Sequence, residues 1–221
     1  MTENVRVAFA DEINELEQDL LKMGSVVEQM LHKSIEALAT RNTQLADEAM
    51  AMDDIVDDYN ISIENRCLRL LALQQPMARD LRTIAAAMKI ITDIERAGDY
   101  VVDIAKTAKH LADEPLFKPL KNIPKMAELA KKMLRETLEA FVSRDLDLIQ
   151  QMIKDDDEVD RLNNILHEEM IEQIKRDPSV TDQAISLILM SRYIERLADH
   201  VTNVGERVYY METGELKELH T

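Results

Sequence analysis

The chain has 221 residues, which is long enough for one large or two small domains with an ordinary apolar core. It carries 43 acidic and 27 basic residues, a formal net charge of -16, so its average field repels nucleic acid backbones and anionic lipid surfaces. The chain has only 4 Gly, 3 Phe and no Trp. This composition disfavours glycine-rich phosphate loops and aromatic base-stacking platforms. We therefore expect no direct contact with nucleic acid.

The cysteine content and the hydropathy pattern favour a reducing cytoplasm. The single Cys67 cannot close an internal disulfide, and no zinc-finger spacing occurs. Residues 1–11 lack the basic start and the apolar core of a signal peptide. The longest mainly apolar stretch, residues 84–91, is interrupted by Lys89 and is far shorter than the roughly 20 residues of a membrane span. We expect a cytoplasmic protein that meets a membrane only indirectly, through partners.

The first half of the chain predicts three helices. Long segments without proline contain apolar residues at alternating steps of three and four, which is typical of a helix face in a bundle. The clearest series occupies residues 84–108: Ile84, Ala87, Ile91, Ile94, Gly98, Val101, Ala105 and Ala108. This spacing predicts helices over residues 8–40, 45–73 and 79–112, with a hairpin turn at Pro76.

A proline-rich linker follows, and then three further helices. Three prolines fall within residues 113–124, and Asn122 with Pro124 predicts the cap and first turn of the next helix. Helices are then expected over residues 125–142, 146–175 and 181–211, with a second hairpin turn at Pro178.

The two halves are similar to each other. Aligning residues 30–60 with 133–163 makes eleven of thirty-one positions identical, and residues 94–99 match 194–199 at an offset of 100. This internal repeat predicts an all-α fold of two tandem up-down-up three-helix bundles, residues 1–113 and 125–221, joined by a linker over 114–124. A single elongated six-helix bundle without separate halves is the alternative.

Acidic residues pair at a spacing of four, which places both members on one helix face. Chance alone yields several such pairs in so acidic a chain. Four of them, however, occupy matching positions in the two repeats: Asp53 with Asp57, Glu95 with Asp99, Asp156 with Asp160, and Glu195 with Asp199.

The hairpins bring these pairs to the same height. Asp57 lies 19 residues before Pro76 and Glu95 lies 19 after it, which is about 28 Å along each antiparallel helix. In the second repeat Asp160 lies 18 residues before the turn proline and Glu195 lies 17 after it. The rotational positions leave open whether the acidic flanks face each other or turn apart.

Converging carboxylates would call for a cation. Two carboxylates at ~5 Å repel by about 3 kcal/mol at an effective dielectric near 20. All-oxygen ligation favours ions such as Mg, Mn, Ca or Fe, and bridging carboxylates allow more than one ion per cluster. Asp103 and Asn203, one helical turn further on, are candidate additional ligands.

Other interpretations of these residues are open. Arg96 and Arg196 stand beside the two glutamates and could form a surface ion-pair network with the acids instead. A ferritin-like di-iron site would need Glu-x-x-His, which the sequence lacks. His167 and His200 lie near the second cluster but have no counterparts in the first repeat.

The chain resembles the PhoU family. The resemblance is carried by the hairpin segment Gln-Gln-Pro-Met-Ala-Arg-Asp-Leu-Arg at 74–82, by Asp-Ile-Glu-Arg-Ala-Gly-Asp at 93–99, and by Tyr-Ile-Glu-Arg-Leu-Ala-Asp at 193–199. It spans nearly the whole chain. One departure is Ala198, where the family usually has glycine beside the second cluster.

The resemblance implies a negative regulator of the phosphate-starvation response. Such a protein links the ATPase subunit of the phosphate ABC transporter to a membrane sensor histidine kinase, and commonly forms a homodimer. It also implies that the paired acids hold metal, as a divalent ion or multinuclear centre of Fe, Mn, Mg or Zn, and that the protein is not an enzyme. The alternatives are a metal-dependent phosphatase or redox enzyme that uses the clusters, and a metal-storing helical scaffold.

Overall fold

The computed structural model describes residues 2–74 and 76–219, with side chains over 9–73 and 76–219. Within these ranges the chain forms seven α-helices and one short 3₁₀ helix, with no strands. In chain order they are α1 (Thr2–Thr40), α2 (Thr43–Ala51), α3 (Asp53–Gln74), α4 (Arg79–His110), α5 (Asn122–Ser143), α6 (Leu146–Arg176), η1 (Pro178–Val180) and α7 (Thr181–Thr213). The predicted all-α fold of two tandem three-helix units is confirmed, and the domain boundaries at 113 and 125 stay a prediction.

The second predicted helix is interrupted at Met52. The Met52 amide donates to the carbonyl of Ala49 at 3.2 Å, and the Ile55 amide donates to the carbonyl of Met52 at 3.0 Å. These hydrogen bonds join residues three apart, as in a 3₁₀ helix, and they separate α2 from α3. The matching helix of the second repeat, α6, runs without a break from Leu146 to Arg176. Asp53 therefore starts a helix, whereas Asp156 lies inside one.

Helix α5 begins three residues before the predicted start at residue 125. Asn122 is the first helical residue, and the capping position belongs to Lys121, whose side chain makes no capping hydrogen bond. Pro124 is then the third residue of the helix, where a missing amide proton costs nothing because the first turn has no intrahelical acceptors. Gln75 of the first hairpin lies outside the described residues.

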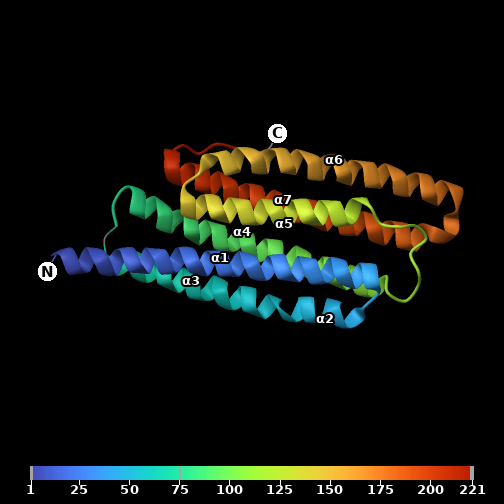
Figure 1. The fold of residues 1–221 in the computed structure, drawn as a ribbon, viewed down its shortest axis with the longest axis horizontal. Helices are drawn as coiled ribbons and strands as arrows, with labels where there is room; N and C mark the ends of the chain where they lie inside the picture. Colours follow the sequence, from blue (N-terminus) through green and yellow to red (C-terminus); the bar gives the residue numbers. More distant parts are fainter. Residues whose placement is uncertain (1, 75, 220–221) are drawn as a thin grey trace.

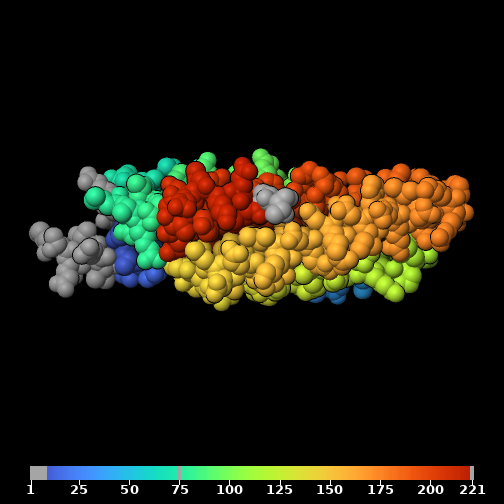
Figure 2. All heavy atoms as spheres, turned by 90° about the horizontal axis from the view of Figure 1, so that it is seen from above, coloured from blue at the N-terminus to red at the C-terminus, as the bar shows by residue number. Residues whose placement is uncertain are grey.

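The helices run lengthwise in an elongated bundle (Figure 1). Among the described elements, the most extensive packing joins α4 with α7, the third helix of each repeat. These two helices are antiparallel, since Arg82 near the start of α4 donates to the carbonyl of Met211 near the end of α7 at 2.9 Å. Seen from above, α6 and α7 lie side by side along one face (Figure 2). The third helices thus form the largest contact between the repeats, and α1 packed on α5 forms a second one.

The two repeats share one hydrophobic core. Fully buried side chains from both halves belong to the same cluster, for example Leu20 and Ile94 from the first and Leu134 and Ile194 from the second. Cys67 is also fully buried in this core. None of the described helices contains an apolar stretch long enough to cross a bilayer. The packed pair α4 and α7 carries the glutamates of both acidic clusters described next.

Candidate metal centre

The first carboxylate cluster joins α3 and α4. The pKa of Asp53 rises to about 6, chiefly because the side chain is partly buried and then because of the negative charges of Asp57, Asp99 and Glu95. Asp53 lies against the α4 backbone, since a Cβ placed on Gly98 would stand 3.4 Å from its Oδ1 atom. The acidic flanks of the two helices therefore face each other, which the sequence had left open.

The second cluster joins α6 and α7 around Glu195. Burial raises the pKa of Glu195, Asp199 and Asp160 raise it further, and Arg192 and Arg196 oppose the rise. Only 9% of this residue is exposed, and its Oε2 atom makes no hydrogen bond to any described residue. Asp156 precedes Asp160 by one helical turn on α6 and is partly buried. A buried carboxylate oxygen without a donor is costly, and a cation would satisfy it.

Arginines occupy part of both clusters. Arg96 contacts Asp99 through Nη1 at 2.9 Å and Glu95 through Nε at 3.6 Å. In the second repeat Arg196 contacts Asp199 at 2.8 Å and Glu195 at 3.8 Å in the same arrangement. The ion pairs of the alternative interpretation are therefore present in this structure.

The two additional candidate ligands have partners outside the clusters. Asp103 pairs with Lys106 on the next turn of α4 at 3.0 Å. The side-chain amide of Asn203 donates to Asp93 on α4 at 3.2 Å. Each of these two side chains thus has a partner that is not one of the cluster carboxylates.

A polar seam between the repeats was not predicted. Asp93 of α4 also contacts His200 of α7 at 3.0 Å, and the ring of Tyr100 stacks on that of Tyr193 with centroids 6.3 Å apart. The tyrosine ring of α4 also lies 5.7 Å from the ring of His200. Spacing within one repeat carries no signal for these pairs, because each joins residues about a hundred positions apart.

The donor set fits a cation that prefers oxygen, but the carboxylates are not gathered round one point. In the parts of the chain that the structure describes, no three Asp, Glu, His or Cys side chains are placed to hold a metal ion together. The arginine side chains that hold the acids are themselves 58% exposed at Arg96 and 45% at Arg196, so they can leave for solvent. Cation binding would then exchange guanidinium partners for metal, with Asp53, Asp57, Glu95 and Asp99 as ligands in one repeat and Asp156, Asp160, Glu195 and Asp199 in the other.

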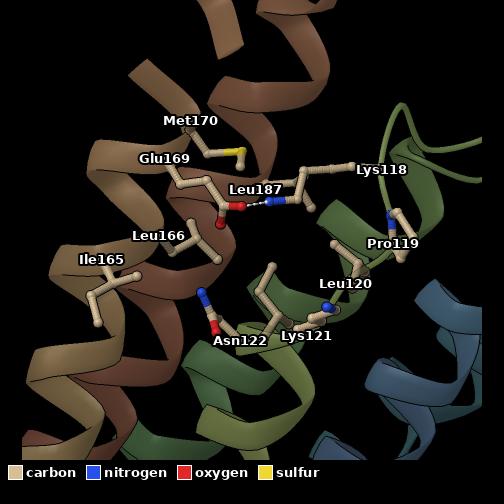
Figure 3. A pocket seen from close by; sticks show the side chains of 11 residues that line it. Lys118, Pro119, Leu120, Lys121, Asn122, Ile165, Leu166, Glu169, Met170 and Leu187 are labelled. Atoms are coloured by element: carbon tan, nitrogen blue, oxygen red, sulfur yellow. Dashed lines mark ion pairs between the residues drawn. The ribbon is translucent and has the colours of Figure 1, made fainter. Parts of the chain in front are cut away.

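A cavity lies away from both clusters. A pocket of about 510 Å³ opens between the linker, α6 and α7. Its lining is mainly aliphatic, with Leu166, Met170 and Leu187 on one side and an ion pair between Lys118 and Glu169 across it (Figure 3). None of the ten predicted metal ligands lines it, and no nucleophile, base and orienting group converge there.

Known proteins share this architecture. The model of the PhoU domain matches the chain twice, over residues 20–108 and 123–208. A phosphate-specific transport system accessory protein PhoU homolog from Clostridium acetobutylicum is 38% identical, covering 97% of this chain and 98% of that protein. The homolog from Aquifex aeolicus is also 38% identical, covering 93% of each.

Solved structures agree with the sequence relatives. The crystal structure of PhoU from Pseudomonas aeruginosa superposes with a TM-score of 0.88 at 30% identity, covering 94% of this chain and 100% of that one. The phosphate transport system regulatory protein PhoU from Streptococcus pneumoniae gives 0.87 at 31% identity, covering 95% and 99%. Fold and acidic clusters define a duplicated helical-bundle protein with two equivalent carboxylate faces. The chain belongs to the PhoU family.

Proposed function

We propose that this protein is a cytoplasmic, non-catalytic adaptor of a phosphate-specific transport system, and that it acts as a negative regulator of the phosphate-starvation response. Its partners would be the ATPase subunit of the phosphate ABC transporter and the sensor histidine kinase of the same response. Family membership supports the link to phosphate transport, because the relatives are named accessory proteins of that system. The protein would work as a homodimer.

The observation that carries the metal-dependent part of the proposal is the pair of facing carboxylate clusters. The neighbouring acids raise the pKa of Asp53 in the first repeat and that of Glu195 in the second. The buried Oε2 atom of Glu195 has no hydrogen bond from the described residues, so the second cluster holds a site that a cation would complete. Bound metal would supply positive charge that locks the acidic faces of paired helices together and changes the surface offered to a partner.

The regulatory mechanism follows from differential binding. An adaptor changes the population of a kinase or transporter state only if it binds one state more tightly than the other. A surface that changes from a strongly negative to a neutralised patch on metal loading provides such a difference. The chain needs no catalytic group for this role.

The test uses the purified chain, the purified transporter ATPase and the cytoplasmic portion of the kinase from the same organism. We expect biolayer interferometry to detect binding to at least one of them with Mn²⁺ present, weakened by a chelator. The doubly substituted Glu95→Gln and Glu195→Gln protein should lose the metal dependence while retaining its circular dichroism spectrum. Absence of binding to both partners would refute the adaptor role. Metal-stimulated phosphatase turnover that disappears in the same variant would favour the enzymatic alternative.

A further inference from the structure

One charge difference between the two carboxylate clusters lies directly beside their glutamates. At the offset of 100 that aligns α4 with α7, Glu95 matches Glu195 and Arg96 matches Arg196. Three residues before each glutamate, however, the first repeat has Thr92 and the second has Arg192. The second cluster therefore has a guanidinium three residues before its glutamate, where the first cluster has none.

The structure shows what the additional arginine does. The Nη1 atom of Arg192 donates to the Oε1 atom of Glu195, one turn along the same helix. Together with Arg196, two guanidiniums thus contact this glutamate. The arginine side chain remains 46% exposed while that of its partner is only 11% exposed, so it reaches the buried acid from the solvent side.

The first cluster has no equivalent contact. The hydroxyl of Thr92 donates to the carbonyl of Met88 on its own helix at 3.5 Å. Glu95 is contacted by Arg96 at 3.6 Å, and among the described residues no other Lys or Arg forms an ion pair with it. Its carboxylate therefore has one competing cation, where the second repeat has two.

A second charge difference between the repeats involves a pair that is neutral in the second repeat and carries one negative charge in the first. At the offset of 103 that aligns α3 with α6, Asp58 matches Arg161 and Ile55 matches Glu158. Arg161 makes two hydrogen bonds to Glu158, at 2.6 and 2.7 Å, so the substituted pair is internally neutralised. Arg161 is thus engaged by Glu158, and the additional positive charge that contacts the glutamate of the second cluster is that of Arg192.

We infer that the two repeats bind cations unequally, with Arg192 acting as a built-in competitor that makes the second cluster the weaker site. This inference rests on the proposed metal binding. A divalent cation at the second cluster must displace a guanidinium from Glu195 and then tolerate its positive charge nearby. At the dielectric of a surface site, one additional neighbouring charge changes the affinity for a divalent ion roughly tenfold, equivalent to about 1.4 kcal/mol. The first-repeat cluster, Asp53, Asp57, Glu95 and Asp99, should fill at the lower cation concentration.

The experiment counts bound Mn²⁺ by electron paramagnetic resonance of the intact chain. Wild-type protein should show a tight and a weak class of sites. Glu95→Gln should remove the tight class, and Glu195→Gln the weak class. In the Glu95→Gln background, Arg192→Thr should tighten the remaining sites about tenfold. In the Glu195→Gln background, Thr92→Arg should weaken the remaining sites by a similar factor.

The exchanged positions are exposed or half-exposed, and circular dichroism verifies that each variant stays folded. Arg176→Thr in the Glu95→Gln background is the matched control, because it removes the same charge from the far end of α6 and should change the affinity by less than about twofold. Equal affinities of the two clusters, or reciprocal substitutions without effect, would overturn the inference and leave the adaptor proposal standing. A wild-type chain that binds no Mn²⁺ would overturn both the inference and the metal-dependent adaptor mechanism.

Discussion

Replacing Asp53 with asparagine is predicted to stabilise the metal-free protein above pH 6. The structure places this carboxylate against Gly98 and beside the acids of α3 and α4, and its pKa rises from 3.8 to about 6. A folded-state pKa above the unfolded value means that the native protein prefers the protonated acid. The associated stability is fully present below about pH 4 and is lost as the pH rises through 6. Asparagine carries no charge, so the variant does not lose this stability as the pH rises.

The magnitude follows from the size of the shift. A shift of this size corresponds to about 3 kcal/mol for a fully buried group. Asp53 is only partly buried, and solvent screening reduces this to roughly 1–2 kcal/mol. Because a negative charge is favourable at a helix N-terminus, removing it at the start of α3 costs the variant about 0.5 kcal/mol. We therefore expect Asp53→Asn to add about 1 kcal/mol to the free energy of unfolding at pH 8 and nothing at pH 4.

Urea denaturation in the presence of a chelator, at both pH values, measures this difference. Asp58→Asn is the matched control, since it removes the same charge from an exposed neighbour that does not contribute to the pKa shift of Asp53. The reasoning is wrong if Asp53→Asn gives the same change at pH 4 as at pH 8, or if the control variant is stabilised equally. Saturating Mn²⁺ should reverse the ranking at pH 8, because the asparagine variant has lost a ligand.

The remaining predictions concern the contact between the repeats and the close approach of helices. A Cβ on Gly24 would meet Leu138 Cδ1 at 2.1 Å, whereas the nearest atom to a Cβ on Gly98 lies at an ordinary contact distance. In thermal denaturation Gly98→Ala should therefore stabilise the protein by about 0.5–1 kcal/mol. The Gly24→Ala variant should be less stable than the Gly98→Ala variant by about 1–2 kcal/mol. Equal stabilities of the two variants would contradict this description of the packing. Arg144 donates to the buried Glu17, so Arg144→Met should cost about 2–3 kcal/mol in urea denaturation. Adding Glu17→Gln should recover most of this loss, and no recovery would show that the pair is not coupled.

The periodicity of apolar residues was sufficient for the architecture. Apolar residues spaced three and four apart predicted the long helices. The prolines of the two hairpin turns predicted which consecutive helices are neighbours. The interruption at Met52 was not predicted, because the apolar spacing continues through it and the break depends on local hydrogen bonding. Helix α5 begins at Asn122, three residues before its predicted start, because an asparagine can either cap a helix or be its first residue.

The candidate site was predictable within each repeat but not between repeats. Equal distances from Pro76 predicted that Asp57 lies level with Glu95. In the structure both carboxylates raise the pKa of Asp53, and Asp57 also raises that of Glu95. Which flanks face each other depends on the handedness of the bundle, and that is a property of three-dimensional packing. The contact of Asp93 with His200 depends on how α4 meets α7, which no spacing in one helix can encode.

Fusing the two bundles into one polypeptide has a consequence for symmetry. In a homodimer of single bundles, one codon would specify both copies of every residue, and any mutation would alter both acidic faces together. Here the threonine of α4 and the arginine of α7 are encoded separately, although they occupy equivalent places. The duplicated chain keeps the arrangement of a two-fold assembly, but its two halves can differ in sequence.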